Sequence, residues 1–136
     1  MQKHETCIAC DQILRTARRQ DAKTTRAWAK QNIQGHTIIH PEFPKAILIT
    51  GGGISEFINQ PHRHYCEKND LLRDIYNVLN GSEYKGVTEY KGRTSHIFEI
   101  KLMGEKSWII ANEHRGMGVL LHSISDSDRV LIGVKK

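Results

Sequence analysis

The chain has 136 residues, of which 38% are hydrophobic and 26% are charged, and its formal net charge at pH 7 is +5. This length suits a single domain with one hydrophobic core, and the composition is that of a foldable, water-soluble protein. The sequence contains no apolar run near the roughly 18 residues that span a membrane, and its N-terminus lacks the pattern of a secretory signal. We therefore expect a cytoplasmic protein with no membrane partner.

Positive charge is concentrated at the N-terminus. Residues 1–35 contain seven lysines and arginines against three aspartates and glutamates, which leaves +4 of the total +5 in this segment. A basic segment is typical of proteins that bind nucleic acid, although a solvated helix face has the same composition. We expect this segment to contact a nucleic-acid substrate through Arg15, Arg18, Arg19 and Arg26.

The three cysteines, Cys7, Cys10 and Cys66, are odd in number, which argues against a disulfide framework. His4, Cys7 and Cys10 follow one another at intervals of three residues and can supply three ligands to zinc. A structural zinc site normally has four ligands, and a thioredoxin-like motif would follow a strand, which is not predicted here. Two reduced thiols on a helix are therefore favoured over metal or redox use, and we expect no cofactor.

The first predicted element is a helix over residues 5–33, which contain no glycine or proline, and Gly35 ends it. We treat residues 1–35 as a basic N-terminal helical segment and residues 36–136 as the main domain. The composition changes at this point from charged residues to short apolar runs with turn residues between them.

The main domain is expected to be built from short elements. Its first part predicts strands at 36–39 and 46–49, a break at the glycines 51–53 and a helical turn at 54–58. Apolar side chains then recur at helical spacing over residues 65–79. Alternating runs predict further strands at 84–90, 95–102, 106–113, 119–125 and 129–134. Helices followed by an antiparallel meander predict an α+β fold with helix packed on one face of the sheet.

Two polar side chains fall on the apolar face of the helix predicted over residues 65–79. Counting back from Leu72 by helical steps gives Lys68 and His64. An ammonium and an imidazole on such a face are costly unless they are paired or open to a cleft. The alternative is that their stems pack while their polar tips reach water. His62, just before the helix, is the substitute for His64 and a candidate for substrate contact.

Further polar candidates lie at strand ends. His96 begins the apolar face of the strand predicted over 95–102, and a hydrogen-bonded histidine at the edge of the core is the alternative. Ser123 and Ser125 share one face at the end of a later strand, where they can donate to a phosphate. Ordinary turn chemistry is the alternative for both serines. Strict alternation directs His122 to the opposite face.

These residue types suit RNA cleavage without a metal ion. We expect His64 and His96 to exchange protons with the 2′-hydroxyl and the leaving oxygen. Lys68 would stabilise the charge on the phosphorane, and Ser123 and Ser125 would hold its oxygens. The sequence has no cluster of carboxylates for two-metal catalysis, and the glycines at 51–53 lack the following lysine of a phosphate-binding loop.

Three runs of sequence resemble one nuclease family. They are ILITGGGISEFINQPHRHYCEKNDLL, TSHIFEIKLMGEKSWII and LLHSISDS, and the resemblance extends over about residues 36–133. The runs look like phage-associated barnase/EndoU/colicin/RelE-like nuclease domains, and the run from His62 to Asn69 is the most specific part. The resemblance implies N-terminal helices packed on a curved antiparallel sheet of about four strands. It also implies metal-independent cleavage of RNA in the cleft of that sheet.

The same resemblance implies roles for individual residues. His64 and Lys68 match polar helix positions, His96 matches a histidine at a strand start, and Ser123 or Ser125 matches a hydroxyl on the last strand. The acidic general base of some branches has no match in these runs. The resemblance implies a phage or prophage setting with a toxin or effector role. The implied partners are RNA and, among proteins, an immunity or antitoxin protein or a phage head protein.

The competing hypothesis is a non-catalytic phage structural or interaction module. Its basic helix would dock onto nucleic acid or a larger protein, and it would bind without turnover. A third hypothesis is metal-dependent activity at a histidine-rich surface. The positions of His64, Lys68 and His96 separate the first two hypotheses, because side chains more than about 10 Å apart cannot contact one phosphate.

Overall fold

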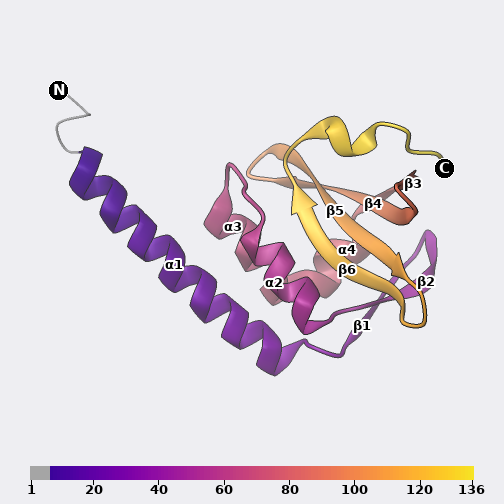
Figure 1. Ribbon diagram of the computed structural model, residues 1–136, viewed down its shortest axis with the longest axis horizontal. Coiled ribbons are helices and arrows are strands. Elements are labelled where there is room, and N and C mark those ends of the chain that lie inside the picture. The colour runs from indigo at the N-terminus through magenta and orange to yellow at the C-terminus, as the bar shows by residue number, and fades with distance from the viewer. Residues whose placement is uncertain (1–6) are drawn as a thin grey trace.

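The computed structural model describes residues 7–136, with side chains from residue 12 onward. Its first element is the helix α1 (Cys7–Asn32), which lies along one side of the molecule and projects beyond it at the N-terminal end (Figure 1). Side chains at 12–20 are exposed, whereas Ala22 and Ala29 are buried in the core. The predicted helix is confirmed, and its C-terminal half packs against the rest of the chain.

The sheet has six strands in the order β1-β2-β6-β5-β4-β3. The strands are β1 (Thr37–His40), β2 (Phe43–Leu48), β3 (Glu83–Tyr90), β4 (Arg93–Leu102), β5 (Glu105–His114) and β6 (Gly118–Ser125). β2 and β6 run parallel, and all other neighbours are antiparallel. The predicted antiparallel meander is confirmed as β3 to β6. The predicted number of about four strands is wrong, because the two short N-terminal runs pair with each other and extend the sheet beyond β6.

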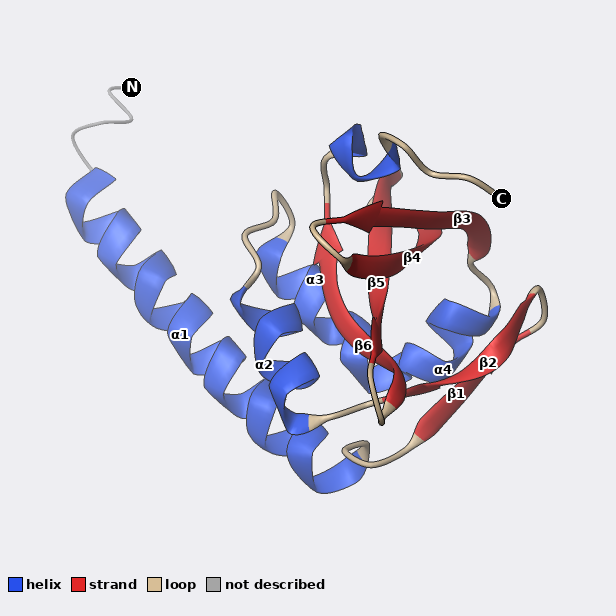
Figure 2. Cartoon of the chain, turned by 45° about the vertical axis from the view of Figure 1, so that its right-hand side comes forward, coloured by secondary structure: helices blue, strands red, loops and turns tan. Residues whose placement is uncertain are grey.

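Three short helices lie between β2 and β3 in the chain, so the prediction that the helices are N-terminal holds only for α1. They are α2 (Gly51–Asn59), α3 (Tyr65–Asp70) and α4 (Ile75–Asn80), and the 3-10 turn η2 (Leu71–Asp74) joins the last two. The chain must cross from β2 to the far edge of the sheet at β3. On the way, the helices cover one face of the sheet with their apolar sides (Figure 2).

The glycines at 51–53 begin α2 rather than breaking the chain, so the predicted break is wrong. Thr50 is the N-cap, and its Oγ1 accepts the backbone N–H of Gly53 at 3.0 Å. Gly53 is buried, and a Cβ added there would lie only 2.2 Å from the carbonyl oxygen of Leu121. Glycine is therefore required at this position for the close approach of α2 to β6.

Side chains of the sheet alternate between two faces. The face covered by the helices, which we call the core face, holds fully buried side chains such as Phe98, Ile109 and Leu121. The opposite face, which we call the outer face, carries Ile97 and Trp108. These two are also buried, but they stand outside the main core cluster. The outer face is thus covered at one end.

The strand predicted at 129–134 is wrong. This stretch contains the 3-10 turn η3 (Asp128–Leu131), which Ser127 caps through its side chain. Beyond the turn, Val87 and Lys135 exchange backbone hydrogen bonds of 2.8 and 2.9 Å in an isolated bridge to β3. Within the described part of the chain, no helix combines the length and apolarity needed to cross a membrane.

Candidate functional site

The segment from His62 to His64 links α2 to α3 and is held against the sheet. His64 Nε2 lies 2.7 Å from Glu105 Oε1 at the start of β5, and the Arg63 guanidinium pairs with the same carboxylate. The backbone N–H of Arg63 donates to Asp126 Oδ2 at 2.9 Å, just beyond β6. The hydrogen bond from His64 is the main cause of a lowered pKa at Glu105. His64 therefore ties this segment to the sheet.

The polar atoms of His62 and Ser125 also form hydrogen bonds within the protein. His62 Nδ1 accepts the backbone N–H of His64 at 2.8 Å, so in the neutral ring Nε2 carries the proton and donates to Ser107 Oγ at 2.9 Å. Burial lowers the pKa of His62, which favours this neutral form. Ser125 Oγ accepts the backbone N–H of Ser127 at 3.0 Å, which is turn chemistry at the end of β6.

Lys68 is fully buried and caps the C-terminal end of α2. Its Nζ donates to the carbonyl oxygens of Phe57, Ile58 and Gln60 at 2.8, 2.8 and 2.7 Å. It also lies 4.3 Å from the centroid of the Tyr65 ring. Burial lowers the pKa of Lys68 to about 8, so the cation still predominates at pH 7. The helical phase correctly predicted that the Lys68 side chain points inward. Its three N–H donors, however, bind backbone carbonyls at the end of α2.

His96 lies on the core face and is buried. Its Nδ1 lies 2.9 Å from the Tyr84 hydroxyl and its Nε2 lies 2.7 Å from Glu113 Oε2. Glu113 also pairs with Lys45 at 3.6 Å, and the hydrogen bond from His96 is the main cause of its lowered pKa. The Phe43 ring packs 4.5 Å from the His96 ring, measured between centroids. Both nitrogens of His96 therefore have partners in the protein.

The histidines expected to act together are far apart. His64 contacts Glu105 at the beginning of β5, and His96 contacts Glu113 near its end. Eight residues of strand separate the two glutamates, which corresponds to roughly 26 Å at about 3.3 Å per residue. Lys68 lies beneath α2 rather than between them. The structure thus does not bring His64, Lys68 and His96 onto one phosphate.

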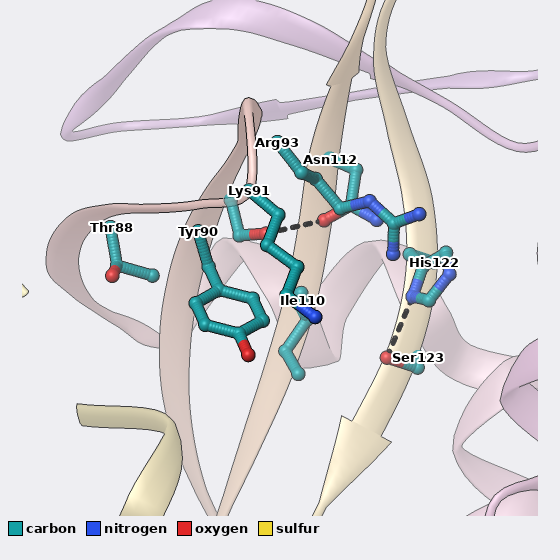
Figure 3. Close-up of a pocket in the computed structure, with 9 residues that line it drawn as sticks. Thr88, Tyr90, Lys91, Arg93, Ile110, Asn112, His122 and Ser123 are labelled. Carbon is teal, nitrogen blue, oxygen red and sulfur yellow. Dashed lines mark hydrogen bonds between the residues drawn. The ribbon is translucent and has the colours of Figure 1, made fainter. Parts of the chain in front are cut away.

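The outer face carries an open hollow of about 380 Å³ beside the β3–β4 hairpin (Figure 3). It is lined by Thr88, Tyr90, Lys91, Arg93, Ser95, Ile110, Asn112, His122 and Ser123. A second hollow of about 360 Å³ shares Arg93, Asn112 and His122 with the first and reaches Gly52 and Glu56 on α2. We call these two adjoining hollows the outer groove.

A β-bulge in β6 places His122 in the outer groove. Leu121 pairs with Ala111 and Ser123 pairs with Ile110, so His122 is the extra residue between them. Strict alternation predicted that His122 points away from the serines, and the bulge makes that prediction wrong for Ser123. His122 Nδ1 lies 2.9 Å from Ser123 Oγ, and Figure 3 shows both side chains on the same side of the strand.

The turn between β3 and β4 forms a cationic wall of the outer groove. Lys91 and Gly92 have φ angles of 51° and 76°, as in a tight two-residue hairpin turn, and Tyr90 pairs with Arg93 across it. In Figure 3 the Arg93 guanidinium is directed toward the His122 ring. Lys91 Nζ lies 5.3 Å from the centroid of the Tyr90 ring. The turn therefore brings two positive charges and an exposed aromatic ring to one edge of the groove.

Opposite charges act on His122 from the two sides of the groove. Burial is the main cause of its lowered pKa, Glu56 opposes the shift, and Arg93 adds to it. On the floor, Asn112 Oδ1 accepts the Ser95 hydroxyl at 2.7 Å, which leaves the amide NH₂ of Asn112 as a donor. The outer groove can thus hold an anion and exchange a proton with it.

A separate hollow collects most of the residues expected to contact substrate. Arg18, Arg19, Arg26 and His62 line a volume of about 490 Å³ between α1 and the end of α2. We call this hollow the basic groove. Arg15 lies one turn further along the exposed part of α1. The structure thus brings four of these five predicted contacts to one surface.

The predicted thiol pair and its histidine fall outside the described part of the chain. His4 precedes the described residues, and the side chains of Cys7 and Cys10 are outside them as well. Cys66 is half-buried on α3, and burial raises the pKa of its thiol. Among the described residues, no group of three or more histidine, cysteine, aspartate or glutamate side chains has an arrangement that can hold a metal ion.

Comparison with known families decides the classification. Residues 16–118, well over half of the chain, match the phage-associated family described as Large polyvalent protein-associated domain 3. The chain belongs to this family. Searches among curated proteins and among solved structures give no match. The matched part of this large polyvalent protein-associated domain begins within α1 and ends at the first residue of β6, so it includes Glu56 and Arg93 and stops before His122.

Of the residues that line the outer groove of this large polyvalent protein-associated domain, only Ser123 was predicted from the sequence to contact substrate. Lys91 and Arg93 flank a glycine between two alternating runs, and this signal for a basic hairpin turn can be read from sequence. Glu56 lies in the predicted helical turn at 54–58, but its neighbours in space come from distant strands. His122 escapes prediction because a bulge has no simple sequence signal.

Proposed function

We propose that this large polyvalent protein-associated domain is a metal-independent ribonuclease whose active site is the outer groove. The observation that carries the proposal is the convergence of Glu56, Arg93 and His122 on one hollow. A carboxylate, a guanidinium and an imidazole can serve as proton acceptor, charge stabiliser and proton donor in RNA cleavage. The phage association of the family is compatible with a toxin or effector role.

In the proposed reaction, Glu56 accepts the proton of the RNA 2′-hydroxyl. The 2′-oxygen forms a bond to phosphorus while the bond between phosphorus and the 5′-oxygen breaks. Protonated His122 gives its proton to the leaving 5′-oxygen, so the products carry a 2′,3′-cyclic phosphate and a 5′-hydroxyl. Arg93 donates to the non-bridging oxygens, where negative charge grows in the transition state, and Lys91 adds a second positive charge.

Neighbouring side chains orient these groups. The hydrogen bond between Ser123 Oγ and His122 Nδ1 leaves Nε2 as the nitrogen that meets the substrate. Tyr90 is 71% exposed at the rim, so a base can stack on its ring. The free NH₂ group of Asn112 supplies a further donor on the floor of the groove. Ser123 keeps a role at the site, as a positioning residue for His122.

The lowered pKa of His122 predicts how the cleavage rate should change with pH. A group that donates a proton must be protonated, and burial favours the neutral ring. The rate of cleavage by the protein should therefore fall with rising pH already below the ordinary histidine value of 6.5. A bound phosphate opposes this effect, because its negative charge favours the imidazolium.

The test is cleavage of a fluorescent RNA oligonucleotide by the purified protein in the presence of EDTA. We expect His122→Gln, Arg93→Gln and Glu56→Gln each to lower kcat/KM by about 100-fold or more. The control is His36→Gln, which changes an exposed histidine outside both grooves. It should stay within about twofold of wild type. Near-ultraviolet circular dichroism of each variant checks that the fold is retained.

Two outcomes would refute the assignment. The first is no RNA cleavage by the folded wild-type protein. The second is equal cleavage by wild type and His122→Gln. Loss of activity in His96→Ala without loss in His122→Gln would move the site to the core face, where the sequence patterns place it.

The second candidate function is a non-catalytic interaction module of a phage protein. The exposed part of α1 at residues 12–20 favours it, because a helix that projects from its own domain has surface to offer a partner (Figure 1). This module would bind RNA or protein without turnover. Tight RNA binding by wild type, with no product after long incubation, would favour it over the ribonuclease.

A further inference from the structure

The basic groove lies at the C-terminal end of α2, whereas the outer groove reaches Gly52 and Glu56 earlier in the same helix. Its lining comes from α1 on one side and from the end of α2 and the start of α3 on the other, and comprises Arg18, Arg19, Ala22, Arg26, Asn59, Pro61, His62 and Tyr65. Arg26 Nη2 donates to Asn59 Oδ1 at 3.1 Å, which fixes one guanidinium across the groove. Asp21, the neighbouring acid on α1, accepts the amide of Asn69 on α3 at 3.2 Å. The groove therefore presents a surplus of positive charge.

The arginines are spread too widely for a single phosphate. Arg18 and Arg26 are separated by eight residues of α1, or about 12 Å along the helix axis. A guanidinium contacts a phosphate oxygen at about 2.7–2.9 Å, so one phosphate cannot meet both ends of this array. A chain of phosphates matches the spacing. The Tyr65 ring and the imidazole of His62 in the same hollow offer apolar faces for bases, which an acidic peptide would not need.

The exposed side of α2 connects the two grooves. Gly52, Glu56 and Asn59 are all exposed and follow one another at helical spacing on one stripe. Gly52 and Glu56 line the outer groove, whereas Asn59 lines the basic groove. The whole stripe is about 10 Å long, which a few nucleotides of an extended strand can span.

From this geometry we infer that single-stranded RNA runs from the outer groove across α2 into the basic groove. The basic groove then holds the RNA one or more nucleotides away from the bond that is cleaved. This inference rests on the proposed function for its starting point. It assigns to Arg18, Arg19 and Arg26 the task of binding the backbone outside the reacting centre.

The experiment measures binding of fluorescent 2′-O-methyl RNA by anisotropy over a range of salt concentrations. The 2′-O-methyl group removes the attacking hydroxyl, so binding is recorded without cleavage. The test variant is the double substitution Arg18→Gln with Arg19→Gln. Its control is Lys23→Gln with Lys30→Gln, which removes the same charge from exposed positions of α1 outside the groove.

For an oligonucleotide of about twelve nucleotides, the test variant should bind at least about tenfold more weakly at low salt. Its slope of log K against log salt should be smaller by about 1.4, because two phosphates of a single strand are no longer neutralised by arginine. The control pair should keep the wild-type slope. A tetranucleotide occupies only the outer groove, so its affinity should be the same in the test variant and in wild type.

Several results would overturn the inference. Equal slopes for the two double variants would show that the arginines act only through general charge. Equal weakening of the tetranucleotide would place them in the outer groove. Binding to anionic lipid vesicles as tight as to RNA, and abolished in the same test variant, would make a membrane surface the ligand. Wild-type cleavage with unchanged binding by the test variant would reject this inference alone, whereas arginine-dependent binding without cleavage would reject the ribonuclease proposal alone.

Discussion

Replacing Lys68 with methionine tests how the end of α2 is held. The substitution keeps an unbranched apolar stem but leaves the carbonyl oxygens of Phe57, Ile58 and Gln60 without their donor. Each buried carbonyl without a donor costs about 2 kcal/mol, or about 6 kcal/mol for the three. Removing the desolvated ammonium returns about 3 kcal/mol, because its pKa falls from 10.5 to about 8. The net expectation is a loss of about 3 kcal/mol in unfolding free energy.

Thermal and urea unfolding followed by circular dichroism measure this loss. A chain of 136 residues unfolds with an entropy of about 0.29 kcal/mol/K, so a loss of about 3 kcal/mol lowers Tm by about 10 °C. The matched control is Lys101→Met, which removes an exposed lysine from β4 and should change stability by less than about 0.5 kcal/mol. A change in Lys68→Met as small as that of the control would refute the capping role.

The same pair of proteins gives a second readout with pH. The folded pKa of Lys68, about 8, lies below the unfolded value of 10.5. Between these values the unfolded chain binds more protons, so the stability of wild type rises with pH from this group. The stability difference between wild type and Lys68→Met should therefore widen between about pH 8 and pH 10, by up to about 3 kcal/mol. A constant difference would mean that Lys68 titrates as an exposed lysine.

Two further predictions concern α2 and β6. Gly53→Ala should destabilise the protein by about 2 kcal/mol or more in urea unfolding, because the new Cβ meets the carbonyl oxygen of Leu121 at 2.2 Å. Gly52→Ala, whose nearest neighbour is 4.0 Å away, should be neutral or stabilising, and equal effects of the two would contradict the close packing. In an NMR titration the ring of His122 should become charged only below pH 6.5, since burial lowers its pKa. Its contribution to stability is then kept above pH 6.5 and disappears as the pH falls through the folded pKa, so wild type should lose stability more steeply in acid than His122→Gln.

The fold was predictable where local patterns are strong. The long first helix and the meander β3 to β6 follow from composition and alternation, which act over short distances along the chain. The pairing of β2 with β6 depends on contacts between residues more than 70 positions apart, such as Ile47 and Val119, and no local pattern encodes it. The helix over the glycines at 51–53 was missed because Thr50 caps it and β6 supports it, and both effects override the poor helix propensity of glycine.

The candidate site was predictable only in part, because the contacts of its side chains also come from residues that are distant in the sequence. The helical phase predicts that Lys68 points inward, but it does not predict that its ammonium donates to three backbone carbonyls. Strand alternation places His96 inward in the same way, and its partners Tyr84 and Glu113 come from neighbouring strands. Sequence patterns identify which polar groups are buried. Whether such a group is occupied by structural contacts depends on the tertiary structure.

This distinction between occupied and available groups is the reason for preferring the outer groove. His62 and His96 have protein partners at both ring nitrogens, so either ring would have to give up a structural contact before it could exchange a proton with a substrate. His122 is held by Ser123 at Nδ1 alone among the described contacts, which leaves Nε2 to the groove. Similarly, neither Lys91 nor Arg93 forms an ion pair within the described residues. Cations left without an anion around a partly buried imidazole are expected where the anion is a ligand, and a phosphodiester supplies that charge.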